Sequence, residues 1–106
     1  MGGIYTAVNE DVTIQPTSDP NQRVYNVRFE MASSPQQGYR GNCPELGPFG
    51  QLVLAIEGVV QVAIGPYVLL VTKAPLFSWN EVEPGVVHLL SEFVRSQRVD
   101  CVLGES

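Results

Sequence analysis

The amino-acid sequence predicts an α+β domain of two layers, in which two helices cover one face of a four-stranded, largely antiparallel sheet. Two segments with helical apolar periodicity each follow a pair of segments with strand-like alternation, which gives the element order β-β-α-β-β-α. Packing both helices on one face of the sheet is the simplest two-layer arrangement for this order. The 106 residues have room for one core, so we expect a single domain over residues 1–106 with its core at about residues 4–97.

The first two strands are expected at residues 4–15 and 24–30. The second of these segments alternates apolar and polar residues, which indicates one packed face and one solvated face. Its apolar face consists of Tyr25, Val27 and Phe29. Residues 16–22 are rich in the proline, serine, aspartate and asparagine residues that favour turns, so the two strands are expected to form a hairpin.

Residues 31–48 are expected to form a long loop, because prolines, glycines and small polar residues interrupt any apolar periodicity there. A connection of this length without regular structure is uncommon in a compact domain, and it indicates either a functional flap or a disordered spacer. Tyr39 and Arg40 are of the residue types that anchor protein interfaces, and Cys43 follows closely. These three are the candidate partner-binding residues, and a mobile loop without a role is the alternative.

The first helix is expected at residues 49–57. Its apolar stripe consists of Phe49, Leu52, Val53 and Ile56, which we expect to lie against the sheet. Pro48 suits the first helical position, where its missing N–H costs nothing. Gly58 suits the left-handed backbone position just beyond the helix.

The second hairpin is expected at residues 59–72, with its turn at Gly65-Pro66. Residues 67–71 are apolar on both faces, so this strand is predicted to be central in the sheet.

The second helix is expected to begin at Ser78, because Ser78 and Glu81 match a capping box. Its apolar stripe consists of Val82, Val86, Leu89, Leu90, Phe93 and Val94. Pro84 removes a backbone hydrogen bond within this helix and predicts a kink or a restart. Beyond it we expect a flexible tail at residues 99–106, with a short strand at residues 99–103.

The charge pattern argues against nucleic acid and anionic membranes as partners. The formal net charge is −5, and no two of the six basic residues are adjacent. Phosphate recognition needs clustered cations, whereas an acidic chain favours a protein partner with a basic surface. No apolar run approaches the roughly 20 residues that span a bilayer, and no secretory signal pattern is present. We therefore expect a cytoplasmic protein that is a monomer or a weak dimer.

Sequence patterns of catalytic and phosphate-binding sites are absent. The chain contains no GxGxxG, GxxxxGK[ST], HExxH, GxSxG or EF-hand pattern. We therefore expect no enzymatic activity, and no catalytic, cofactor-binding or metal-binding residues.

The two cysteines, Cys43 and Cys101, form no CxxC pair and have no ligand spacing to the single histidine. Two free thiols in a reducing compartment are the simplest interpretation. A long-range disulfide is one alternative, and a metal ion or iron–sulfur cluster held by both cysteines, across a dimer, is another.

Four short motifs follow one another in the second half of the chain: Ile56-Glu57-Gly58-Val59, Gly65-Pro66, Val71-Thr72-Lys73 and Trp79-Asn80, with Pro84 in the helix that follows. Their order and spacing resemble the N-terminal domain of the NifU/Nfu iron–sulfur cluster scaffold proteins, and the resemblance covers about residues 13–94. Asp19-Pro20-Asn21 is similar to the family's TPNP turn, although it has Asp19 where the family has threonine and Gln22 where it has proline. The CxxC motif that holds the cluster in this family lies in a separate domain, and neither cysteine of this chain corresponds to it.

The resemblance implies a non-catalytic accessory domain that docks a partner, an iron–sulfur carrier or client protein, in cluster assembly or delivery. It transfers no catalytic residue and no cofactor. A direct metal or cluster binder through Cys43 and Cys101 is the alternative, as is a binding module unrelated to cluster biogenesis.

Overall fold

The computed structural model of the chain describes residues 6–7, 11–42 and 44–104, and it confirms the α+β fold with a largely antiparallel sheet. Within these residues the elements are β1 (Thr6–Ala7), β2 (Val12–Pro16), β3 (Gln22–Val27), β4 (Gln36–Tyr39), α1 (Pro48–Leu54), β5 (Val59–Ile64), β6 (Val68–Lys73) and α2 (Trp79–Gly104). The strands form one antiparallel sheet in the order β1-β2-β3-β6-β5-β4. The two predicted hairpins therefore meet through β3 and β6, and β6 is central as expected.

The predicted sheet has four strands, and the structure adds one short strand at each edge. At one edge the described part of residues 4–15 forms two strands, β1 and β2, in place of one. At the other edge the expected loop at residues 31–48 contains β4, which pairs with β5 so that Gly38 lies opposite Val62. The residues Gln36–Tyr39 do not alternate between apolar and polar, so the sequence gives no periodic signal for this strand. The strand forms through its pairing with β5.

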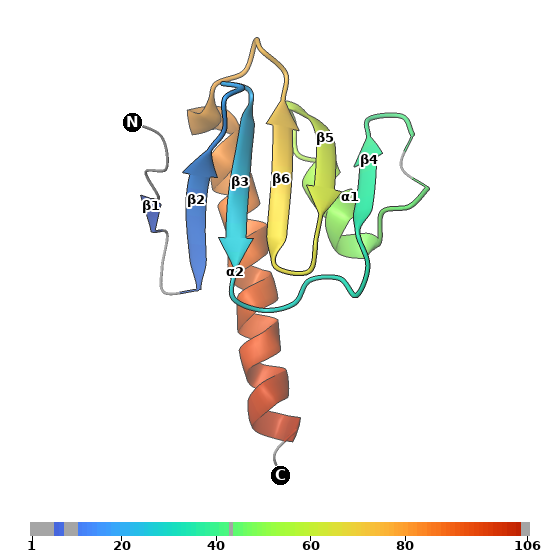
Figure 1. Cartoon of the computed structure of the whole chain (residues 1–106), viewed down its shortest axis with the longest axis vertical. Helices are drawn as coiled ribbons and strands as arrows, with labels where there is room; N and C mark the ends of the chain where they lie inside the picture. The colour runs from blue at the N-terminus through green and yellow to red at the C-terminus, as the bar shows by residue number, and fades with distance from the viewer. Residues whose placement is uncertain (1–5, 8–10, 43, 105–106) are drawn as a thin grey trace.

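Both helices lie on the same face of the sheet, as predicted (Figure 1). They contact each other through Phe49 of α1 and Phe93 of α2, whose ring centroids are 5.4 Å apart. The buried side chains of the strands point toward the helices and form the core with residues of both helices. The fully buried core residues are Val12, Tyr25, Val53, Val59, Val62, Leu69, Val71, Val82, Val86 and Leu90.

Helix α1 begins at Pro48, one residue before the expected range but with the proline at its start as predicted, and it ends at Leu54, three residues before the expected end. The expected apolar stripe is wrong at Leu52, whose side chain is 56% exposed. The buried side of the short helix is formed by Gly50, Val53 and Leu54. Gly58 follows with φ of 96°, which confirms the predicted left-handed position.

Helix α2 is one continuous element from Trp79 to Gly104, so it does not restart at Pro84. At its beginning the Ser78 backbone N–H donates to the Glu81 carboxylate at 2.8 Å, which is one half of the predicted capping box. The short strand expected at residues 99–103 is wrong, because these residues continue the helix. Extending an existing helix adds one hydrogen bond per residue, whereas a separate strand would need a pairing partner.

The first residue of α2 is tied to the turn between β2 and β3. The Trp79 indole N–H donates to the Pro20 carbonyl at 2.9 Å. Beneath the ring, the buried Lys73 ammonium group donates to the Asn21 side chain at 2.9 Å. The Lys73 nitrogen lies 5.8 Å from the ring centroid and the Arg23 guanidinium 4.8 Å from it, both within the range of cation–π attraction.

A second polar group joins α2 to β3 one turn further along the helix. Glu83 forms an ion pair with Arg23, and the Tyr25 hydroxyl donates to the same carboxylate at 3.1 Å. Burial raises the pKa of Tyr25 well above its ordinary value, and the Glu83 carboxylate raises it further because a second negative charge is unfavourable there.

The Gly58→Ala substitution tests the tight turn after α1. A Cβ at Gly58 would lie 2.8 Å from the Phe77 ring and 2.9 Å from Val82. Gly41 also has positive φ, but no atom lies within 4 Å of a Cβ placed there. We expect Gly41→Ala to lower the free energy of unfolding by about 1 kcal/mol, and Gly58→Ala by at least about 2 kcal/mol more. Urea denaturation measures both, and equal losses would contradict the packing at Gly58.

The raised pKa of Tyr25 predicts alkaline sensitivity. The unfolded chain releases this proton near pH 10, but the folded chain retains it, so the contribution of Tyr25 to stability is present below about pH 10 and is lost above it. We expect the free energy of unfolding to decline less steeply above about pH 10 in Tyr25→Phe than in the wild type. The control is Tyr67→Phe, which changes a half-exposed tyrosine. We expect its free energy of unfolding to decline with pH as steeply as that of the wild type. Parallel declines in all three proteins would contradict the assignment.

Candidate functional site

The face of the sheet opposite the helices has no charged side chain at its outward positions. Side chains alternate along each strand, so the residues between the buried ones point away from the helices. These residues, called the open face below, are Thr13, Gln15, Gln22, Val24, Asn26, Gln37, Tyr39, Gln61, Ala63, Val68, Leu70 and Thr72. They are carboxamides, hydroxyls and small or medium apolar residues, and none of them is buried. Lysine, glutamate, arginine and aspartate are almost never fully buried, so a broad solvated face without any of them is a distinguishing feature of this surface.

An apolar row crosses the centre of the open face. Val24 of β3 lies opposite Leu70 of β6, which lies opposite Ala63 of β5. The row ends in a carboxamide at each side, at Gln15 on β2 and Gln37 on β4. The arrangement resembles the centre and the rim of a protein interface, where apolar residues are surrounded by hydrogen-bonding groups.

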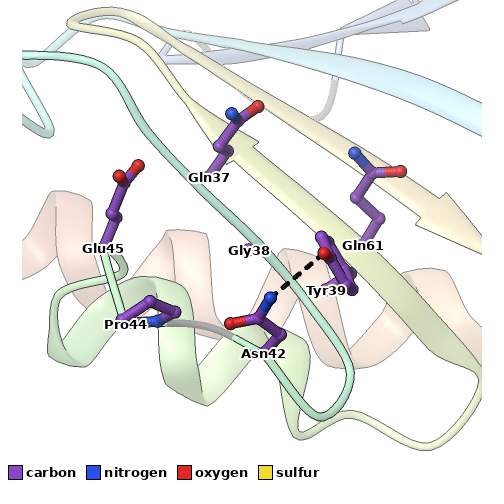
Figure 2. Close-up of a pocket in the computed structure, with 7 residues that line it drawn as sticks. All are labelled: Gln37, Gly38, Tyr39, Asn42, Pro44, Glu45 and Gln61. Atoms are coloured by element: carbon purple, nitrogen blue, oxygen red, sulfur yellow. Dashed lines mark hydrogen bonds between the residues drawn. The ribbon is translucent and has the colours of Figure 1, made fainter.

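A hollow of about 310 Å³ lies beside β4, where the open face meets the loop that leads to α1 (Figure 2). Its lining consists of Gln37, Gly38, Tyr39, Asn42, Pro44, Glu45 and Gln61. The Asn42 side chain donates a hydrogen bond of 3.1 Å to the Tyr39 hydroxyl, which fixes the half-exposed ring at the edge of the hollow (Figure 2). Glu45 contributes the one carboxylate of this lining.

A second hollow of about 320 Å³ lies near the turn between β5 and β6. Its lining consists of Asp11, Thr13, Asn26, Val27, Arg28 and Tyr67. The ring of Tyr67 is 55% exposed, close to the 53% of Tyr39. A half-exposed tyrosine therefore borders the open face at each of two hollows, and tyrosine is a common anchor of protein interfaces.

Of the three residues predicted to bind a partner, the structure places Tyr39 on the open face and directs Arg40 away from it. The Arg40 guanidinium donates to the carbonyls of Leu54, Ile56 and Val59, at 3.3, 3.1 and 2.6 Å. These contacts fasten the end of β4 to the carbonyl end of α1, which attracts positive charge. Cys43 lies outside the described residues.

Metal chemistry was an alternative for Cys43 and Cys101. Cys101 lies in α2, but its side chain, like all of Cys43, lies outside the described part of the chain. Among the residues that are described, no group of three or more histidine, cysteine, aspartate and glutamate side chains could hold a metal ion. Within the same residues, no helix combines the length and apolar content that crossing a bilayer requires.

Sequence reasoning missed the open face as a site. The predicted strand at residues 24–30 includes Arg28 and Glu30 on its polar side, so its outer face looked like ordinary solvated surface. In the structure β3 ends at Val27, and its outward positions are uncharged. The signal was the absence of charge at alternate positions of five segments, which is visible only when the register between the strands is known.

Comparison with known proteins gives a family and a fold. The family model described as scaffold protein Nfu/NifU N terminal matches residues 12–97. Among solved structures, the crystal structure of protein SAV1430 from Staphylococcus aureus has a TM-score of 0.63, and the two sequences are 17% identical. The alignment covers 74% of this chain and 96% of that protein, so the two share a fold. No curated protein sequence matches the chain.

The Arg40→Ala substitution separates a structural role from partner binding. We expect it to lower the free energy of unfolding by about 1–2 kcal/mol, because three backbone carbonyls lose a charged donor. Arg40→Lys should restore less than half of the loss, since an ammonium group cannot present several donors in one plane. The control is Arg95→Ala, which removes an exposed helical ion pair and should change stability little. If Arg40→Ala and Arg95→Ala are equally stable in urea, the proposed role of Arg40 is wrong.

Proposed function

The chain belongs to the Nfu/NifU N-terminal scaffold family, and on this basis we propose that it is a non-catalytic accessory domain that docks a protein partner in iron–sulfur cluster assembly or delivery. The partner is a carrier or client protein that holds the cluster itself. The docking surface is the open face, with Tyr39 and Tyr67 at its borders.

The absence of charge on the open face is the observation that carries this proposal. The chain has a net charge of −5, yet none of the outward side chains of the four strands β2, β3, β5 and β6, or of the edge strand β4, is ionised. Charged residues are depleted at the centres of protein interfaces because removing them from water is costly. A face free of charge can therefore be covered without that cost.

The chemistry of the open face suits a protein better than a small molecule. Carboxamide and hydroxyl groups can both donate and accept, so they can pair with backbone and polar groups of many geometries. The two hollows are near the lower limit of volume for small-molecule sites, and both are open to solvent at the border of a broad surface. A partner that spans the apolar row and inserts groups into the hollows would use all of these features.

A non-catalytic role agrees with the family, whose N-terminal scaffold domains are generally non-catalytic. Among the described residues, the linings of the two hollows contain no histidine, cysteine, lysine or serine, and their two carboxylates, Glu45 and Asp11, lie in different hollows. We further propose that the chain acts as one domain in the cytoplasm, as a monomer or a weak dimer.

The Leu70→Lys variant tests the docking surface. Tagged wild-type and variant proteins are used to capture partners from an extract of the source cells, and iron–sulfur assembly proteins are quantified by mass spectrometry. We expect the wild type to enrich carriers or clients of cluster assembly, and Leu70→Lys to reduce their recovery about tenfold or more, since a charge is buried in the apolar row.

The matched control is Leu52→Lys, which makes the same change at an exposed leucine of α1 on the helical side of the sheet. Circular dichroism confirms that both variants are folded. The proposal is contradicted if the wild type captures only proteins unrelated to cluster biogenesis. Equal capture by Leu70→Lys and wild type would remove the open face as the docking surface.

A further inference from the structure

The backbone of the edge strand β4 leaves one residue unpaired beside the first hollow. The Arg40 N–H donates to the Val60 carbonyl of β5, so the backbone groups of alternate residues face β5 and those between them face the outer edge of the sheet. Tyr39 and Gln37 are the residues that face outward. Tyr39 exchanges both hydrogen bonds with Asn42, whereas Gln37 has no such partner among the described residues. Its carbonyl and its N–H are therefore available to a group that enters the hollow.

The side chains of the lining add further hydrogen-bond acceptors. The Asn42 amide nitrogen donates to the Tyr39 hydroxyl at 3.1 Å, which leaves the amide oxygen of Asn42 to accept. The carboxamides of Gln37 and Gln61 form no hydrogen bond with another described residue. They point in the same direction as the carboxylate of Glu45, which lies on the side of β4 away from β5 (Figure 2). The hollow is thus bordered by several unused acceptors.

Glu45 gives this hollow a full negative charge. It forms no ion pair among the described residues, and within them the lining contains no basic side chain. Arg40 retains its charge, but its guanidinium lies at carbonyls near the end of α1, whereas Glu45 precedes the beginning of α1 at Pro48. A helix of seven residues is about 10 Å long, which exceeds the Debye length of about 8 Å at physiological ionic strength. The beginning of the helix adds only about half of a positive elementary charge.

An arginine side chain matches these groups better than a lysine or a neutral amide does. A guanidinium has five N–H donors and no acceptor, so it can bind several oxygens at once and can pair with a carboxylate through two parallel hydrogen bonds. Its flat surface also stacks on aromatic rings. Tyr39 presents a half-exposed ring at the edge of the hollow, held there by Asn42. A lysine ammonium has fewer donors and no plane to stack.

We propose that the hollow beside β4 accepts an arginine side chain of the partner protein. The guanidinium lies against the Glu45 carboxylate and the Gln37 carbonyl, and its plane covers the Tyr39 ring. This inference rests on the proposed function, because the hollow borders the open face, and it names the chemistry that the partner presents there.

The arginine also sets the orientation of the partner on the open face. The second hollow is lined by both Asp11 and Arg28, whose charged groups are 3.7 Å apart, so the two charges there offset each other. Among the described residues the first hollow therefore carries a net charge and the second does not. A partner with one arginine at the matching position can use only one of these two borders, which fixes its direction across the sheet.

Titration of the ¹⁵N-labelled full chain with blocked pentapeptides tests the proposal, with the amide NMR spectrum as the readout. The peptides differ only in the central residue, which is arginine, its uncharged isostere citrulline, or lysine, between threonine and glycine residues. We expect the arginine peptide to bind with a millimolar Kd and to shift the amide resonances of Gly38, Tyr39, Asn42 and Glu45. The citrulline peptide should bind at least about tenfold more weakly, and the lysine peptide at least about threefold.

The Glu45→Gln variant removes the charge and keeps a side chain of similar shape. Its Kd for the arginine peptide should rise at least about fivefold, and its preference for arginine over citrulline should be lost. The matched control is Glu57→Gln, which removes an exposed carboxylate outside the hollow and should bind the arginine peptide like the wild type. The same spectra establish that both variants are folded.

The proposal is overturned if the arginine peptide leaves the resonances of the hollow unchanged, or if the citrulline peptide binds equally well. It is also overturned if Glu45→Gln keeps the wild-type affinity. Free arginine that binds at least about tenfold more tightly than the peptide would identify a site for a small molecule and would overturn it as well. These results are independent of the capture experiment with Leu70→Lys, so a failure of this inference can be told apart from a failure of the proposed function.

Discussion

The packing of both helices on one face of the sheet is the constraint on which the rest of this structure depends. Helices α1 and α2 contact each other through Phe49 and Phe93 and bury the alternating apolar side chains of the strands (Figure 1). The opposite side chains are left outside the core, in a domain too small to supply a third layer. A fold of this kind has one broad sheet surface available for contacts, and in this chain that surface is uncharged.

The orientation of α2 follows from a polar cluster that also explains several motifs of the family resemblance. Trp79 donates to the Pro20 carbonyl and covers Lys73, which in turn donates to Asn21. These four residues come from three motifs, so the turn between β2 and β3, the end of β6 and the start of α2 are held together. The cluster therefore ties together three segments that are distant in sequence.

Much of the fold could be predicted from the sequence, because its signals are local. Proline and glycine beside α1, the capping pair at Glu81, the alternation in β3 and the apolar run in β6 each reflect the conformation of a few adjacent residues. The strand β4 could not be predicted, since it has no apolar pattern and exists through pairing with β5. For the same reason the role of Arg40 was missed: its carbonyl partners at the end of α1 are distant in sequence and come near only in the folded sheet.

The central claim is that the uncharged sheet face binds the partner in cluster assembly. The most direct measurement is a methyl NMR titration of the isotopically labelled chain with a purified iron–sulfur carrier or client recovered from the source cells. The account predicts that the methyl resonances of Val24, Ala63, Val68 and Leu70 shift, whereas those of the buried Val71 and the helix residue Leu52 stay in place. Shifts confined to α1 and α2, with the sheet methyls unchanged, would contradict it.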